Sequence, residues 1–115
     1  AYDAVDYSVS NGRVKIASGS RNYELQIFGR HNLENVEAAR LLCNEAGISN
    51  QSFYKSISIF TGAQRRLQLL IKKENNYVYY DFAHAPSKVK ATTDAVREKH
   101  PGSKIISCLE LHTFY

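Results

Sequence analysis

Alternation of polar and apolar residues predicts strands in the first quarter of the chain. Tyr7–Ser10 and Arg13–Ala17 alternate with a period of two, and they flank Asn11-Gly12. This dipeptide is the strongest short signal for a two-residue hairpin turn. Tyr23–Ile27 alternates again after a turn-rich segment. We therefore expect three strands in antiparallel order.

The period then changes to that of a helix. The apolar positions with helical spacing are Val36, Ala39 and Cys43. Asn32 is the expected N-cap of this helix, and Gly47 is expected to end it as the residue after the C-cap. A second helix is predicted to open at Ser49 or Asn50 and to run to about Phe60.

A polar break separates the two halves of the chain. Thr61–Arg66 contains glycine and two arginines, and both the hydrophobic period and the charge change there. Leu67–Lys73 and Tyr77–Tyr80 are predicted strands joined by a turn at residues 74–76. The unbroken β-forming run Tyr77–Tyr80 is typical of a buried strand. We expect the two halves to pack separately, with a hinge at the break.

The last third predicts a helix between two strands. Pro86 suits the first turn of a helix whose body is Ser87–Lys99. Pro101-Gly102 is a predicted turn, and Lys104–Leu109 is a predicted buried strand. This order indicates a right-handed βαβ unit that starts a parallel sheet.

Composition narrows the class of protein. The chain has 115 residues, of which 43% are hydrophobic and 23% charged, as in ordinary globular domains. It has no apolar run of about 20 residues and no signal-peptide pattern at its start. Two cysteines without a dense framework favour a reducing compartment. The chain begins at Ala1 and contains no Met, so we expect a piece of a longer protein.

The formal charge of +4 lies in the second half. Residues 1–62 carry six Lys/Arg and six Asp/Glu, whereas residues 63–115 carry nine and five. A basic half suits a phosphate-bearing ligand or nucleic acid, although solvated surface lysines explain most such charges. The chain contains neither a G-x-x-x-x-G-K-[ST] phosphate loop nor a G-x-G-x-x-G motif.

Three polar groupings could bind a nucleotide. His31, Asn32 and Asn35 lie at one predicted helix end, where an amide can hydrogen-bond a base edge. Arg66 could bind a phosphate through two hydrogen bonds. Asp81, between a strand end and a helix start, could accept from the two hydroxyls of a ribose, with His84 nearby. Each residue is also explained singly by capping or by surface charge.

The order and spacing of motifs around these residues resemble those of the Mur ligases, a family of ATP-dependent enzymes. Three motifs run in the family's order over nearly the whole chain: Gly29-Arg30-His31-Asn32-Leu33-x-Asn35-x-x-Ala38-Ala39, Phe60-x-Gly62-x-x-Arg65-Arg66 and Asp81-Phe82-Ala83-His84-x-Pro86. The piece is similar to the group that comprises UDP-N-acetylmuramate–L-alanine ligases and murein-peptide ligases. It departs from the family at Tyr80, where a second acid is usual, and at Ala85, where a second histidine is usual.

The resemblance implies an α/β fold with two domain parts. Residues 1–62 would be the end of a central ATPase domain, with β-hairpins and two helices. Residues 63–115 would be the first strand–helix–strand of a Rossmann-like C-terminal domain. The implied parent enzyme is cytoplasmic and joins L-alanine or a murein peptide to UDP-N-acetylmuramate through an acyl phosphate. The alternative is a non-catalytic module that binds nucleotide or nucleic acid.

The resemblance also implies roles for six residues. His31, Asn32 and Asn35 would contact the adenine side of ATP, Arg66 the phosphate or ribose side, and Asp81 the ribose. His84 would help to place phosphates or the incoming substrate. The phosphate loop and the Mg²⁺ ligands of the family would precede residue 1. No catalytic residue and no metal ligand is therefore expected within the chain, and neither nucleic acid nor membrane is an expected partner.

Overall fold

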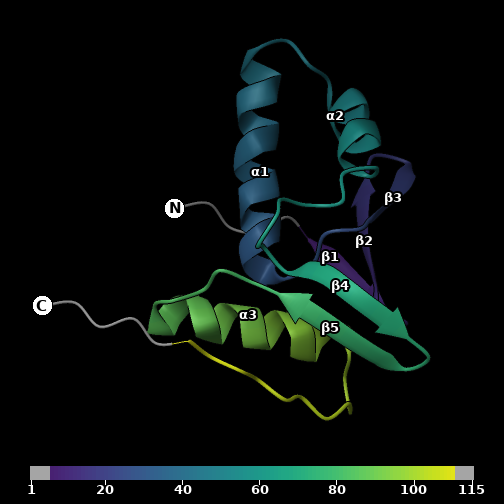
Figure 1. The fold of residues 1–115 in the computed structure, drawn as a ribbon. Helices are drawn as coiled ribbons and strands as arrows, with labels where there is room; N and C mark the ends of the chain where they lie inside the picture. Colours follow the sequence, from purple (N-terminus) through teal and green to yellow (C-terminus); the bar gives the residue numbers. More distant parts are fainter. Residues whose placement is uncertain (1–5, 111–115) are drawn as a thin grey trace, which may run out of the picture.

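The computed structural model describes residues 6–110 of the chain. Two small sheets and three helices make up the fold, with α1 and α2 on one side of the β4–β5 hairpin and α3 on the other (Figure 1). The molecule is flat, with principal extents of 44 × 41 × 20 Å. None of the helices in the described part is long and apolar enough to cross a membrane.

The first sheet confirms the three predicted antiparallel strands. Its strands, in spatial order, are β1 (Tyr7–Ser10), β2 (Arg13–Ser18) and β3 (Arg21–Leu25). Asn11 and Gly12 have φ angles of 53° and 74°, the left-handed values that a two-residue hairpin turn requires. Val14 and Ile16 of β2 are buried, because alternate residues of a strand point to the same face.

Two helices follow, with bounds that differ from the predicted ones. They are α1 (Arg30–Glu45) and α2 (Asn50–Ile57). Gly47, with φ of 88°, ends α1 as predicted, and the Ser49 side chain accepts from the Ser52 N–H at the start of α2. The predicted N-cap is wrong: the N-cap of α1 is Gly29, and Asn32 lies inside the first turn. Helix α2 ends three residues before Phe60.

The second half forms an antiparallel hairpin and one helix. Its elements are β4 (Gln68–Lys73), β5 (Asn76–Tyr80) and α3 (Pro86–Lys99). Pro86 opens α3 as predicted, since its missing N–H would have no partner in a first turn.

The α/β class is confirmed, but the predicted βαβ unit is incomplete. Residues 104–109 form neither a strand nor a helix, and Ile106 is 79% exposed. Tyr77–Tyr80 was expected to be a buried strand, yet Val78 and Tyr80 of β5 are exposed. The prediction fails for a physical reason: a β-forming run becomes a strand only beside a partner strand, and it becomes buried only when both faces of its sheet are covered.

Side chains from both halves meet in one buried cluster. Leu67 and Ala95 of the second half are buried in the same cluster as Leu33 and Phe28 of the first. The Phe28 and Tyr79 rings pack edge to face with centroids 5.4 Å apart. The described residues therefore do not show the separately packed halves that we expected, although Thr61–Arg66 is a largely exposed connection between them.

Candidate functional site

Asp81 ties together three parts of the second half. It directly follows β5, and its Oδ1 accepts from the Leu67 N–H at 2.9 Å. Its Oδ2 accepts from the Ala83 N–H at 3.1 Å and from the Thr92 hydroxyl at 2.7 Å. A carboxylate has about four acceptor positions, so one remains for a further donor. Asp81 is thus held in place by the start of β4, its own loop and α3.

His31 lies in the first turn of α1, opposite this loop. Its Nδ1 atom is buried and has no hydrogen-bond partner among the described residues. Burial lowers the pKa of His31 below its ordinary value of 6.5, and the Asp81 carboxylate opposes that shift. The positive charges of Lys88 and Arg66 lower the same pKa further. His31 is therefore neutral at pH 7, and its buried Nδ1 has no polar partner among the described residues.

The helix ends beside these residues suit an anion. No side chain caps the N-terminus of α3, and its first turn contains no acidic residue. The same holds for α1. The N–H groups at a helix start carry partial positive charge, and Arg66 and Lys88 add full charges to the same region.

The structure brings together only part of the predicted set. His31, Arg66 and Asp81 interact electrostatically across the two halves. The Asn32 amide donates to the Phe28 carbonyl at 2.9 Å, which leaves its side-chain oxygen as the group that can accept. Asn35 is exposed on α1 and forms no hydrogen bond with the other candidate residues within residues 6–110.

His84 and Arg66 lie at the exposed edge of the site. Nδ1 of His84 lies 3.0 Å from the Phe82 carbonyl oxygen. The centroids of the His84 and Phe82 rings are 5.3 Å apart. Arg66 forms no ion pair within the described part of the chain. Both side chains are free to meet a ligand that enters from solvent.

Two contributing residues were missed by the reasoning from sequence. Thr92 donates to Asp81, and Lys88 acts on His31. Lys88 and Thr92 are four residues apart, so they lie on one face of α3. That spacing, on a helix that follows Asp81 closely, was the signal that could have identified them.

No family profile matches the chain. It is 39% identical over 92 residues to the UDP-N-acetylmuramate–L-alanine ligase of Cutibacterium acnes, covering 79% of this chain and 20% of that protein. An enzyme of the same name from Christiangramia forsetii is 30% identical, covering 97% of this chain and 27% of that protein. The chain thus spans about a fifth to a quarter of the curated relatives it matches.

Two solved structures share the fold. UDP-N-acetylmuramate-alanine ligase MurC from Thermotoga maritima matches with a TM-score of 0.71 and 23% identity, covering 85% of this chain and 24% of that one. MurF from Acinetobacter baumannii matches with a TM-score of 0.61 and 25% identity, covering 76% and 20%.

The described elements form an α/β fold that the chain shares with the solved structures of MurC and MurF. The curated relatives and the structural neighbours together support a more definite statement. Over the matched residues, this chain belongs to the Mur ligase family.

Proposed function

We propose that this chain is part of a cytoplasmic, ATP-dependent ligase that joins L-alanine to UDP-N-acetylmuramate. The observation that carries the proposal is the 39% identity over 92 residues to a curated enzyme of that name. Residues 1–62 would close the central nucleotide-binding domain, and residues 63–115 would open the domain that presents the incoming amine.

The geometry supports a nucleotide between the two halves. Asn32 lies in the first turn of α1 and keeps an amide oxygen that can accept from a base, and His31 precedes it in the same turn. Asn35 would add a second amide one turn further along α1. Arg66 and Lys88 suit phosphates because their charges already act on this region.

Asp81 suits a ribose hydroxyl. Three hydrogen bonds orient its carboxylate, and the remaining acceptor position is available to one donor. His84 would contact phosphates or the incoming substrate from the exposed edge. We expect the Mg²⁺ ligands of the proposed ligase to lie in other parts of the protein.

In the proposed reaction ATP phosphorylates the substrate carboxylate, and the amine then attacks the acyl phosphate and releases inorganic phosphate. The part played by this segment is to bind and orient the nucleotide. The sequence contains no phosphate loop, so the segment alone is expected to bind ATP weakly and to catalyse nothing.

The test is a phosphate-release assay on the full-length ligase, with ATP, UDP-N-acetylmuramate and either L-alanine or a murein tripeptide. Release that depends on L-alanine supports the proposal. Release only with the tripeptide would assign the protein to the murein-peptide ligases instead. No release with either amine would contradict a ligase function altogether.

A further inference from the structure

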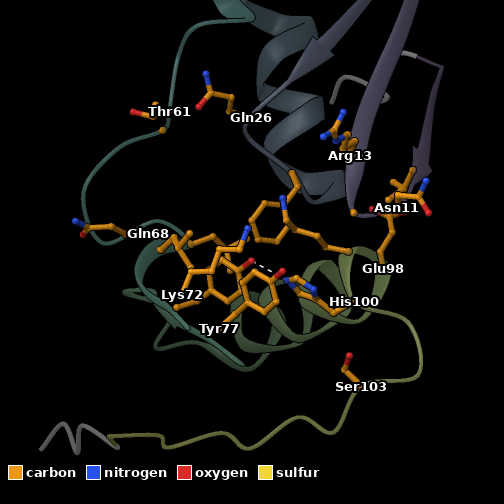
Figure 2. Close-up of a pocket in the computed structure, with 18 of the residues that line it drawn as sticks. Asn11, Arg13, Gln26, Thr61, Gln68, Lys72, Tyr77, Glu98, His100 and Ser103 are labelled. Carbon is orange, nitrogen blue, oxygen red and sulfur yellow. Dashed lines mark hydrogen bonds between the residues drawn. The ribbon is translucent and has the colours of Figure 1, made fainter. Parts of the chain in front are cut away.

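A cavity separate from the candidate nucleotide site lies between the two halves. It has a volume of about 1180 Å³ and is lined by the β1–β2 hairpin, the loop at 61–64, the β4–β5 hairpin and the C-terminal end of α3. None of His31, Asn32, Asn35, Arg66, Asp81 or His84 lines it. Figure 2 shows Lys72, Tyr77 and His100 close together on one wall, with Asn11 and Arg13 on the hairpin side.

The charges that line this cavity are predominantly positive. Arg13, Lys72 and Lys99 contribute cations, and the one lining carboxylate is Glu98. Glu98 already accepts a hydrogen bond of 2.7 Å from the Tyr7 hydroxyl. Within residues 6–110, neither Lys72 nor Lys99 takes part in an ion pair. Arg13 pairs with Glu24 at 3.7 Å, so Lys72 and Lys99 are the lining cations that have no ion pair among the described residues.

The two lysines are held in position by aromatic rings. Lys99 Nζ lies 4.6 Å from the centroid of the Phe28 ring, and Lys72 Nζ lies 5.7 Å from that of Tyr77. Tyr77 in turn packs on His100 with ring centroids 4.3 Å apart. The Tyr79 hydroxyl lies 2.8 Å from Nε2 of His100, which joins β5 to the C-terminal end of α3 on this wall.

Burial makes the unneutralised charge costly. Lys99 is half-buried, and burial lowers its pKa, with a further lowering from Lys72. Lys72 is exposed but close enough to repel the Lys99 ammonium, and an anion bound to both would relieve that repulsion. Asparagine, glutamine, threonine and serine side chains on the remaining walls can donate to the same anion.

We propose that this cavity binds a phosphate-bearing anion through Lys72 and Lys99, at a site distinct from the nucleotide site of the ligase. A phosphate group carries up to two charges and several acceptor oxygens, which matches two ammonium groups surrounded by neutral donors. Lys73, the next residue of β4, does not line the cavity and serves as the internal control.

The experiment is lysine footprinting of the full-length ligase, with the nucleotide site first saturated by ADP. An amine-acylating reagent labels the lysines in the presence of pyrophosphate or of sodium chloride at equal ionic strength, and mass spectrometry gives the labelling rate of each residue. At about ten times the dissociation constant, pyrophosphate should slow the labelling of Lys72 and Lys99 by about tenfold and leave Lys73 unchanged. Equal rates in pyrophosphate and chloride at Lys72 and Lys99 would overturn the proposal.

A variant makes the test independent of any single labelling rate. Lys72→Gln removes one cation at an exposed position of β4, and Lys73→Gln is the matched control. In Lys72→Gln, protection of Lys99 should require about tenfold more pyrophosphate, because one charge-assisted hydrogen bond is lost. If pyrophosphate protects Lys99 in both variants at the same concentration as in the wild-type protein, Lys72 does not bind the anion and the proposed site is wrong. Protection confined to Lys88, which lies beside His31, would assign the pyrophosphate to the nucleotide site and also overturn it.

Discussion

The hydroxyl of Thr92 donates a 2.7 Å hydrogen bond to Oδ2 of Asp81, eleven residues earlier in the chain. This bond joins α3 to the loop that follows β5, and the Leu67 N–H joins the start of β4 to the other carboxylate oxygen. Asp81 is therefore both a structural acceptor and the predicted ribose contact. The first two predictions separate these two roles.

Thr92→Val should destabilise the chain by about 1–3 kcal/mol. Valine keeps the branched shape of threonine but removes the shorter of the two hydrogen bonds to the partly buried Oδ2 of Asp81. Urea unfolding of the purified chain measures the change. Thr93→Val is the matched control, since its exposed hydroxyl donates only to the Val89 carbonyl, and it should change stability by less than about 0.5 kcal/mol. Equal effects of the two variants would show that Thr92 does not hold Asp81.

Asp81→Asn should raise the KM for ATP of the full-length ligase. The variant keeps the shape of the side chain but turns one acceptor oxygen into a donor, so a contact to ribose weakens. It also places an N–H₂ group near donors that the carboxylate now satisfies, which should cost about 1–3 kcal/mol of stability.

Steady-state kinetics on the folded fraction distinguishes the two effects. Thr92→Val is the comparison, because it loosens Asp81 without removing its charge. If Asp81→Asn lowers stability while the folded fraction keeps the wild-type KM for ATP, Asp81 is a structural residue and its assignment to the ribose is wrong.

The ring of His31 should titrate below pH 6.5, and its charge neighbours should move that titration in opposite directions. Removing the opposing carboxylate in Asp81→Asn should lower the pKa of His31 further. Removing a cation in Lys88→Gln should raise that pKa. NMR titration of the imidazole protons measures both shifts. Shifts of the same sign, or none, would contradict the juxtaposition of these side chains.

The lowered pKa of His31 makes the stability of the chain depend on pH. Because burial lowers the pKa of His31 in the folded state, the unfolded state takes up the proton first as the pH falls. His100 acts in the same direction, since burial and Lys99 lower its pKa too. The free energy of unfolding should therefore decline as the pH falls below 6.5, and the decline should be smaller in His31→Gln. Urea unfolding at several pH values measures it.

Gly29→Ala should cost about 2–4 kcal/mol of stability. Gly29 has φ of 93°, and a β-carbon there would lie 2.6 Å from the β-carbon of Ala95 on α3. Gly19→Ala is the control, because its φ is 62° but no atom lies within 4 Å of the added carbon, so only about 1 kcal/mol of backbone strain is expected. Similar losses in the two variants would mean that α1 and α3 do not meet closely at this point.

Limited proteolysis should cleave the chain near Gly62. Thr61–Arg66 is largely exposed and lies outside the helices and strands, and such connections are the preferred sites of cleavage. Mass spectrometry of early fragments locates the cut. The predicted boundary between residues 1–62 and 63–115 fails if this segment resists protease while other loops are cleaved.

The sequence by itself determined the turns and helix ends that depend on the backbone preference of a single residue or dipeptide. Asn11-Gly12 sets the first hairpin turn, Gly47 ends α1 and Pro86 opens α3, because each residue type has a backbone preference that acts within a few positions. The spacing of the three motifs was enough to indicate the Mur ligase family, since motif order needs no contact information.

Tertiary structure decided everything that depends on residues distant in the chain. Residues 104–109 have a strand-like pattern but form no strand, because pairing needs a neighbouring strand that local propensity cannot supply. The sequence placed Asp81 at a strand end, but only the fold showed that Leu67 and Thr92 hold its oxygens. Lys72 and Lys99 are 27 positions apart in the chain, yet both line one cavity. They do so because the β4–β5 hairpin and α3 pack on the same buried cluster. The hydrophobic effect stabilises such packing whatever the separation of the residues in the chain.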